Sequence, residues 1–295
     1  MDQRHPTTGR KQEKEYRVKR RHSLLWLFYI IPPLLIGTVV LAGVAFLHAT
    51  EPPSATRDTT QSSPEVEEPI EPPQSHTEDP NAPRIYLTFD DGPSETSTLS
   101  ILNTLDTYEV KATFFVLGYM AETYPEKITH QFDQGHVIAN HGYSHDYGAV
   151  YASADAFMAN IERCEQVLTA IIGEQPPRIT RFPAGSAAVQ LEANPTMRDE
   201  IKSRLSTDGW RFFDWDVSFG DSILEAPQPG ELGTRLIGLI DERVNSGATD
   251  IVVLGHDVDS KPWTPIDLPM VIEHCLNAGY VFKTLQLDTP PVEYR

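Results

Sequence analysis

The sequence has few cysteines and, beyond its first residues, few basic side chains. Its 295 residues include two cysteines, which allow one disulfide at most. Lys and Arg number 24 against 42 Asp and Glu, which gives a formal net charge of −18. Residues 1–22 hold eight Lys and Arg and three Asp and Glu, so the rest of the chain carries −23. A body this acidic argues against nucleic acid as a partner.

Charged side chains are missing from the stretch Leu24 to Leu47. This run exceeds the roughly 20 apolar residues that cross a bilayer, whereas a cleaved signal peptide has an apolar core of about 7 to 15. We therefore expect residues 23–48 to be an uncleaved transmembrane anchor, with a cleaved signal peptide as the alternative. Basic residues directly precede the run, so residues 1–22 should be a cytoplasmic arm and everything after the span should lie outside the cell membrane.

A third region, residues 49–83, is poor in large apolar residues. Positions 51–83 contain eight prolines, eight Asp and Glu, and one basic residue, Arg57. Such a segment buries too little apolar surface to offset its ordering entropy, so we expect an extended extracellular linker. The cysteines, Cys164 and Cys275, fall in helix-like segments, and their spacing supplies no geometry from which to predict a disulfide.

Residues 84–295 alternate strand-like and helix-like patterns and show no internal repeat. The strand-like runs are RIYLTF, ATFFVL, HVIAN, RITRF, WRFFDWDV, DIVVLGH and YVFKTLQL. Helical patterns lie around 98–107, 154–172, 231–246 and 266–278. This alternation predicts parallel strands with crossover helices, hence an α/β sheet or barrel. Polar residues at the C-terminal ends of such strands are the usual site of chemistry.

The first strand-like run ends in DDGP, with Asp90 and Asp91 side by side. Two solvated acids in a turn are the simple interpretation, because Asp before Gly-Pro suits a turn. Neighbouring side chains of a straight strand point to opposite faces. Both carboxylates can therefore serve one site only where the strand gives way to the turn.

His141 and His145 follow the third strand-like run in HGYSHDYG, which reads as a loop. Two imidazoles and one carboxylate are a common ligand set for a divalent first-row metal, with positions left for water and substrate. The pair could equally be incidental loop histidines. The same ligand set also occurs in non-haem iron oxygenases, so further residues have to decide.

Three further strand ends carry polar residues, in RFPAGS, FDWDVS and VVLGHD. Arg181 could hold a neighbouring carboxylate ionised, and Asp214 could orient a histidine, for which His256 is the candidate. Taken singly, each has an ordinary explanation as a surface ion pair, a turn acid or a strand-end histidine. Taken together, those explanations require several independent coincidences at predicted strand ends.

The order TFDDGP, HGYSH, RFPAG, DW and GHD resembles the NodB-homology polysaccharide deacetylases of carbohydrate esterase family 4. The resemblance covers about residues 84–283. It implies an irregular (β/α) barrel and a divalent metal, usually zinc and sometimes cobalt or manganese. The tethered arrangement is similar to that of a membrane-anchored peptidoglycan deacetylase.

The resemblance also implies a role for each matching residue. The metal ligands would be Asp91, His141 and His145. The catalytic residues would be Asp90 as general base, Arg181 as its holder, His256 as general acid and Asp214 as the residue that orients His256. The substrate and oxyanion residues would be Ala184, Trp215 and Val253.

Two of these positions depart from the family pattern. Ala184 stands where an aromatic residue is usual, which leaves the backbone N–H for an oxyanion but removes a wall of the substrate groove. Val253 stands where the last motif usually has Leu. The type of reaction is therefore better specified than the substrate.

The implied reaction is hydrolysis of an acetamide on an N-acetylated cell-wall or extracellular polysaccharide, most simply peptidoglycan, with release of acetate. Two alternatives remain: an O-acetyl esterase of the xylan type that uses the same site, and a non-catalytic carbohydrate-binding module. A binding module would not need base, acid and ligands together. An ester alkoxide needs less help from an acid than an amine does, so Asp214 with His256 favours amide cleavage.

Overall fold

The structure is a computed structural model that describes residues 79–223 and 227–294. The predicted arm 1–22, the predicted anchor 23–48 and most of the predicted linker 49–83 lie outside the described residues. None of the helices in the described ranges is long and apolar enough to cross a membrane. The described residues form one compact unit.

One parallel sheet organises this unit, and every described strand except β6 begins within a residue or two of the start of a predicted run. Its path runs β5-β4-β3-β2-β1-β7-β6, and β8 pairs with the beginning of β1. The strands are β1 (Arg84–Asp90), β2 (Thr113–Val116), β3 (Val137–Asn140), β4 (Ile179–Thr180), β5 (Arg211–Phe212), β6 (Val217–Ser218), β7 (Asp250–His256) and β8 (Val281–Phe282).

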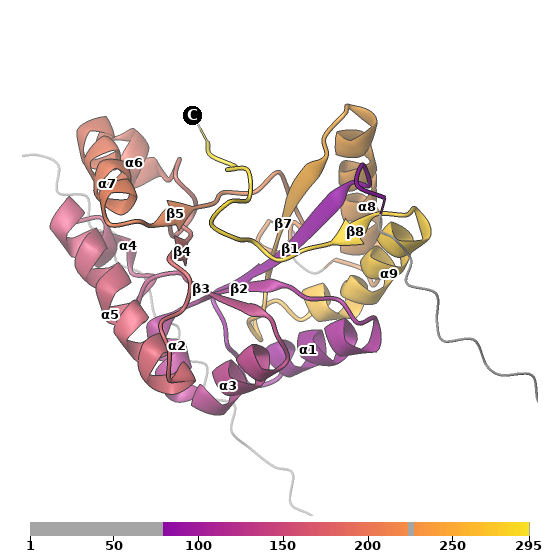
Figure 1. Cartoon of the computed structure of the whole chain (residues 1–295), viewed down its shortest axis with the longest axis horizontal. Helices are drawn as coiled ribbons and strands as arrows, with labels where there is room; N and C mark the ends of the chain where they lie inside the picture. Colours follow the sequence, from indigo (N-terminus) through magenta and orange to yellow (C-terminus); the bar gives the residue numbers. More distant parts are fainter. Residues whose placement is uncertain (1–78, 224–226, 295) are drawn as a thin grey trace, which may run out of the picture. The chain divides into compact units, whose positions relative to one another are not determined.

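Helices pack around the outside of the curved sheet, while the C-terminal segment runs into its interior (Figure 1). The described helices are α1 (Ser97–Thr107), α2 (Gly118–Thr123), α3 (Pro125–Asp133), α4 (Tyr147–Val150), α5 (Ala154–Ile172), α6 (Val189–Glu192), α7 (Pro195–Thr207), α8 (Glu231–Asn245) and α9 (Trp263–Asn277). The longest, α5, has the expected ends. The Ser153 hydroxyl caps its first turn, and Gly173, with φ of 84°, ends it in the left-handed region.

The sheet is an open half-barrel rather than a closed barrel, because no pairing joins β5 to β6 in the described part of the chain. The predicted single strand WRFFDWDV is split into these two edge strands. The amide of Phe213 bonds to the Thr180 carbonyl of β4, and the amide of Asp216 bonds to the Val252 carbonyl of β7. The short segment between β5 and β6 therefore crosses the gap between the two edges.

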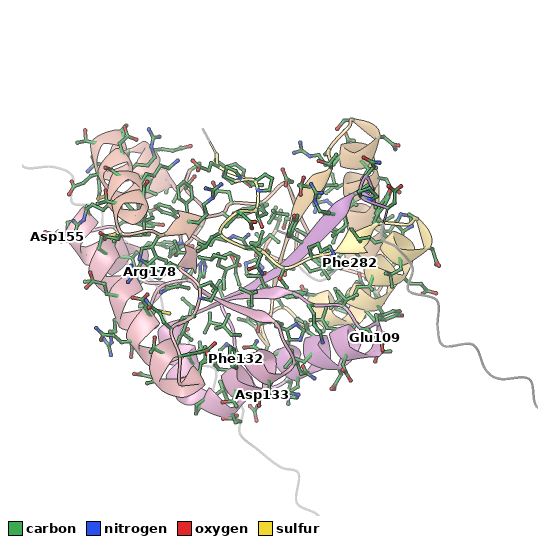
Figure 2. All side chains as sticks on the ribbon, in the orientation of Figure 1. Glu109, Phe132, Asp133, Asp155, Arg178 and Phe282 are labelled. Carbon is green, nitrogen blue, oxygen red and sulfur yellow. The ribbon has the colours of Figure 1, made fainter. Side chains whose placement is uncertain are left out.

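Apolar side chains fill both faces of the sheet (Figure 2). The largest cluster lies between the sheet and α1, α5, α8 and α9, and it includes both cysteines, which are buried and free. A second cluster includes Tyr151 and Phe157, and the smallest lies inside the half-barrel and includes Phe115, Phe213, Val252 and Leu285. Such burial on both faces is typical of parallel sheets, and it leaves the C-terminal strand ends as the place for polar groups.

Candidate active site

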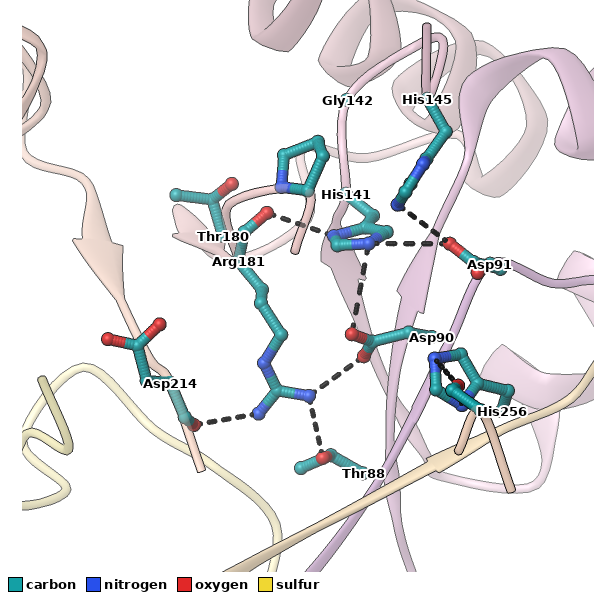
Figure 3. A network of polar contacts seen from close by, with 12 residues as sticks. Thr88, Asp90, Asp91, His141, Gly142, His145, Thr180, Arg181, Asp214 and His256 are labelled. Atoms are coloured by element: carbon teal, nitrogen blue, oxygen red, sulfur yellow. Dashed lines mark hydrogen bonds and ion pairs between the residues drawn. The ribbon is translucent and has the colours of Figure 1, made fainter. Parts of the chain in front are cut away.

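A cavity of about 360 Å³ lies at the C-terminal ends of the strands. It is lined by residues near or after the C-terminal ends of β1, β3, β4, β5, β6 and β7, so segments far apart in the sequence meet there. All three predicted metal ligands line it, and so do Asp90 and His256. Arg181 and Asp214 are fully buried and are not among its lining residues, and Figure 3 shows Arg181 between Asp214 and Asp90.

Asp91, His141 and His145 converge on one point (Figure 3). The Nε2 atoms of the two histidines lie 3.4 and 3.5 Å from Oδ1 of Asp91. One ligand atom from each residue fits within 4.8 Å of the others, as metal binding requires. Asp91 reaches this position because its φ of 74° turns the chain out of β1, so that Asp90 and Asp91 both face the cavity.

Two asparagines fix the conformation of the histidine loop, the segment that carries His141 and His145. Asn140, the last residue of β3, accepts the amide of Gly142 and donates to the Ile161 carbonyl of α5. Asn160 of α5 accepts the amide of Ser144 and donates to its carbonyl. Gly142 has φ of 86° and packs against Asn160, where a side chain would collide. Both ends of the loop are thus hydrogen-bonded to α5. This support explains why two histidines that do not lie on a helix can both point to Asp91.

The cluster fits a divalent cation. Oδ1 of Asp91 is buried and has no hydrogen-bond partner among the described residues. Burying such an acceptor is unfavourable unless a donor or a cation binds it, and a cation would do so here. Nδ1 of His141 lies 2.9 Å from the Arg181 carbonyl, which fixes the ring so that Nε2 faces Asp91. The set of one carboxylate and two imidazoles leaves open positions, as catalytic zinc sites do.

Protonation within the cluster follows from burial and charge. Burial disfavours an ionised Asp91, but the two imidazoles outweigh it and hold the pKa of Asp91 well below its usual range. Burial also lowers the pKa of His145, which favours the neutral form that can ligate. At His141 the carboxylates of Asp90 and Asp91 outweigh burial and raise the pKa. A cation would therefore compete with a proton for His141.

Asp90 is held by Arg181 and is nearly inaccessible to solvent. Its Oδ1 lies 2.8 Å from Nη1 of Arg181, while its Oδ2 faces His141 at 3.7 Å. The fully buried guanidinium also donates to the hydroxyl of Thr88 and to the carbonyls of Phe213 and Asp214. Arg181 thus fixes the position of the Asp90 side chain and at the same time satisfies backbone groups in the gap between β5 and β6.

Asp221 orients His256. Nδ1 of His256 lies 2.9 Å from Oδ1 of Asp221, and Oδ2 accepts the His256 amide and the Thr264 hydroxyl. Burial disfavours the imidazolium, but the hydrogen bond and charge of Asp221 outweigh it and raise the pKa of His256 to about 9. The same hydrogen bond outweighs burial at Asp221 and lowers the pKa of that carboxyl. At neutral pH the cavity therefore holds a protonated histidine.

The prediction that Asp214 orients His256 is wrong. The Asp214 carboxylate accepts the amide and hydroxyl of Ser186 and the amide of Tyr294. It lies beyond Arg181, on the far side from His256 in Figure 3. Asp214 thus stabilises the loop after β4 and the C-terminal segment, because a fully buried carboxylate needs this many donors.

Of the three predicted substrate residues, Ala184 and Trp215 line the cavity. The amide of Ala184 has no hydrogen-bond partner in the described ranges, and the backbone turns there, with φ of 64° at Ala184 and 81° at Gly185. The third prediction, Val253, is wrong, because its fully buried side chain packs between β7 and the helices. Leu254 lines the cavity instead, since successive side chains of a strand point to opposite faces.

The sequence interpretation missed Asp221, Tyr147 and Leu254. Asp221 could have been found from the second strand end in WRFFDWDVSFGDS, where an acid follows Gly220. Reading that stretch as one strand hid the end of β6. Tyr147 carried no signal beyond its place two residues after His145.

An open parallel barrel with this site at its C-terminal edge defines a hydrolase with a paired acid and base. Residues 77–202 match the polysaccharide deacetylase family. The catalytic domain of a peptidoglycan N-acetylglucosamine deacetylase from Eubacterium rectale superposes with a TM-score of 0.66 at 31% identity, over 74% of this chain and 94% of that chain. This chain therefore belongs to the polysaccharide deacetylase family, within the group of polysaccharide N-deacetylases.

Curated relatives point the same way. A peptidoglycan-N-acetylglucosamine deacetylase of Bacillus cereus is 26% identical over 200 residues, which make up 67% of each chain. A peptidoglycan-N-acetylmuramic acid deacetylase of Bacillus subtilis is 33% identical over 72% of this chain, but the match spans 40% of that protein. The two relatives are named for different sugars of one polymer.

Proposed function

We propose that this protein is a metal-dependent hydrolase that removes N-acetyl groups from the amino sugars of peptidoglycan and releases acetate. One observation carries the proposal. A carboxylate held by an arginine, Asp90, and a histidine held protonated by a carboxylate, His256, line the same cavity as the Asp91, His141 and His145 cluster. A general base, a general acid and a cation site are what hydrolysis of an unactivated amide needs.

Each residue has a separate task in the proposed reaction. Zinc, cobalt or manganese held by the cluster would polarise the acetamide and activate water. Asp90 takes a proton from the attacking water, and Arg181 keeps that carboxylate in place. The free amide of Ala184 donates to the oxygen that becomes negative. His256 then gives its proton to the departing amine nitrogen, and acetate and a free amino sugar result.

The strength of the acid bears on the choice between amide and ester. An amine must be protonated to leave, and the pKa of about 9 keeps His256 ready to do this across the neutral range. This supports N-deacetylation over an O-acetyl esterase. The paired acid and base also count against a binding module, which would have no use for either group.

The polymer and the location are inferred from separate features. The relatives that are named as peptidoglycan deacetylases support N-acetylglucosamine or N-acetylmuramic acid as the substrate sugar. The uncharged run Leu24 to Leu47 and the basic residues before it support a single-pass cell-membrane protein with an external catalytic domain. An enzyme tethered outside the membrane would meet the cell wall directly.

The experiment is to incubate the full chain with peptidoglycan, with N-acetylglucosamine oligomers and with acetylated xylan, and to measure acetate and free amine separately. We expect equal amounts of acetate and amine from an N-acetylated polymer, loss of both after chelation, and recovery with zinc or cobalt. Acetate without amine would identify an esterase, and activity that survives complete metal removal would overturn the cation site. Asp90→Asn protein serves as the matched inactive control.

A further inference from the structure

Tyr147 is the most exposed aromatic side chain in the active-site cavity. It begins α4, two residues after His145, and it is 38% exposed. Its hydroxyl has no hydrogen-bond partner among the described residues. Trp215 is the other Tyr or Trp side chain that lines this cavity in the described ranges, and it is more buried. An exposed ring with a free hydroxyl is a ready contact for a ligand.

The ring of Tyr147 is held in place from two sides. Tyr151, one helical turn further on, lies parallel to it, with ring centroids 6.4 Å apart and planes 7° apart. The ring of His145 lies beside it in a T-shaped arrangement, with ring centroids 4.9 Å apart. Tyr151 is itself buried, and it stacks on Phe157 in the core. Much of the entropy that an exposed side chain would lose on binding is therefore lost already on folding.

The stacked rings of Tyr147, Tyr151 and Phe157 place Tyr147 beside the reacting groups. The hydroxyl of Tyr151 donates to the carbonyl of Pro183 at 2.7 Å. Pro183 precedes Ala184, whose amide is the proposed oxyanion donor. The side chain of Ala184 contributes only a methyl group to the cavity wall. Tyr147 therefore stands next to His145 on one side and is connected through Tyr151 to Ala184 on the other.

We propose that Tyr147 is the platform on which the sugar ring that carries the acetyl group packs. This inference rests on the proposed function. The C–H face of a pyranose ring is apolar and slightly positive, and it complements the negative face of a phenol ring. The free phenol hydroxyl can donate to or accept from a sugar hydroxyl. A neutral sugar face is thus recognised beside the charged groups of the site, Asp90, Asp91 and His256.

The test uses the full chain loaded with zinc and an N-acetylglucosamine tetramer as the probe. KM and kcat are measured separately, and binding of the tetramer to the Asp90→Asn background is measured by calorimetry. Tyr147→Ala and Tyr147→Leu should both raise KM and weaken binding about 3- to 10-fold, which is the usual size of an aromatic contact. Tyr147→Phe should lose far less, because it keeps the ring.

Two controls separate a platform from a structural role. Phe132→Ala removes an aromatic ring of similar exposure, 36%, from α3, away from the active site (Figure 2), and it should change neither parameter. Bound zinc is measured in every variant, since His145 touches Tyr147. Tyr147→Leu keeps bulk against Tyr151 without the aromatic face, so it remains informative if Tyr147→Ala loses metal.

The outcomes are distinct. Native affinity in zinc-loaded Tyr147→Leu would overturn the platform, and so would failure of the native chain to bind the tetramer. Absence of acetate release from every polymer would overturn the proposed function instead. In that case the calorimetric comparison still decides the role of Tyr147, because it does not depend on turnover.

Discussion

His256 can act as a proton donor at neutral pH chiefly because of Asp221, with smaller contributions from Asp90 and Asp91. A buried imidazole alone would be neutral, since burial disfavours its charged form. The 2.9 Å contact with Asp221 reverses this and raises the pKa of His256 to about 9. Asp90 shows the same design with opposite charge, because Arg181 lies 2.8 Å from its carboxylate. Each reacting residue thus has one buried partner of opposite charge.

Replacing Asp221 should change the pH dependence of the reaction. In Asp221→Asn the His256 pKa should fall from about 9, because the hydrogen bond and charge of Asp221 are lost while the burial and the charges of Asp90 and Asp91 remain. The alkaline limb of kcat/KM should therefore move to lower pH by about one to two units. A profile of kcat/KM between pH 5 and 10 measures this. An unmoved limb would show that His256 is not the acid.

Asp214→Asn is the matched comparison for that experiment. This carboxylate accepts three hydrogen bonds but does not contact His256. We expect an alkaline limb at the native position and a free energy of unfolding that is lower by about 1–3 kcal/mol, since the amide cannot satisfy every donor. A shifted limb with native stability would contradict the assignment of Asp214.

The two neighbouring carboxylates should respond differently to the same substitution. Asp90→Asn should retain bound metal and lose about 10²- to 10⁴-fold in deacetylation, because the amide cannot accept a proton from water. Asp91→Asn should lose metal and activity together. Metal content by mass spectrometry and acetate release report on both. An Asp90→Asn protein with near-native turnover would show that the roles are wrongly assigned.

Asp257 should make stability depend on pH. It is 1% exposed, its Oδ1 has no hydrogen-bond partner in the described part of the chain, and burial raises its pKa to about 7. The folded state therefore holds a proton that an unfolded carboxyl with a pKa near 3.9 releases, so this group lowers stability as pH rises from about 4 to 7.

Asp257→Asn should remove this loss. The variant should gain stability relative to the native chain at pH 8 compared with pH 5, because an amide has no proton to release. Urea unfolding at the two pH values, at one metal concentration, gives the difference. An equal difference at both pH values would mean that Asp257 keeps one protonation state throughout that range.

At the scale of elements, the histidine loop depends on a helix that contributes no ligand. Asn160 of α5 binds both the amide and the carbonyl of Ser144, which lies next to His145. The long helix α5 is anchored in turn by its apolar face against the sheet. A rigid helix is therefore the support that fixes the loop geometry.

Removing the contact between α5 and the histidine loop should lower the affinity for zinc. Asn160→Ala removes both hydrogen bonds to Ser144, and we expect about 10-fold weaker zinc binding, the lower end for supporting residues around a metal. Competition with a chelating dye measures the affinity. Asn103→Ala, on the exposed face of α1, is the control and should bind zinc as the native chain does. Equal affinities in both variants would show that α5 does not position the loop.

At the scale of the whole molecule, the half-barrel is completed by segments that are not strands. Arg181 donates to two carbonyls in the gap between β5 and β6, and the amide of Asp214 in that gap bonds to the Val292 carbonyl of the C-terminal segment. The hydroxyl of Tyr294 bonds to the Trp215 carbonyl. The two ends of the catalytic domain's chain therefore both contribute near the site, one through β1 and one through this segment.

The proposed anchor and linker predict a result in whole cells. If residues 23–48 cross the membrane with residues 1–22 inside, protease added outside should cut between residues 51 and 83 and release an active domain. The proline-rich, acidic composition of that segment favours an extended and accessible chain. Activity in the supernatant and immunodetection of the released fragment measure this. Cleavage that occurs only after lysis would reverse the orientation.

Hydrophobic periodicity and the polar residues at strand ends were enough to predict most of the strands, the long helices and the position of the site. Apolar runs predicted the strands, amphipathic patterns predicted α1, α5, α8 and α9, and polar residues after strands located the site at one edge of the sheet. Asp90, Asp91, His141, His145 and His256 lie together there as those patterns required. These features follow from local chemistry, because side-chain alternation and turn residues act over a few positions.

Tertiary structure decided the rest. A single predicted strand became the two edges of an open sheet, and this change made Asp221 rather than Asp214 the partner of His256. The same packing turned Val253 towards the helices and Leu254 into the cavity. Which carboxylate reaches a given imidazole depends on how the backbone crosses the gap between distant strands. That path is set by the packing of the whole domain, so no local pattern contains it.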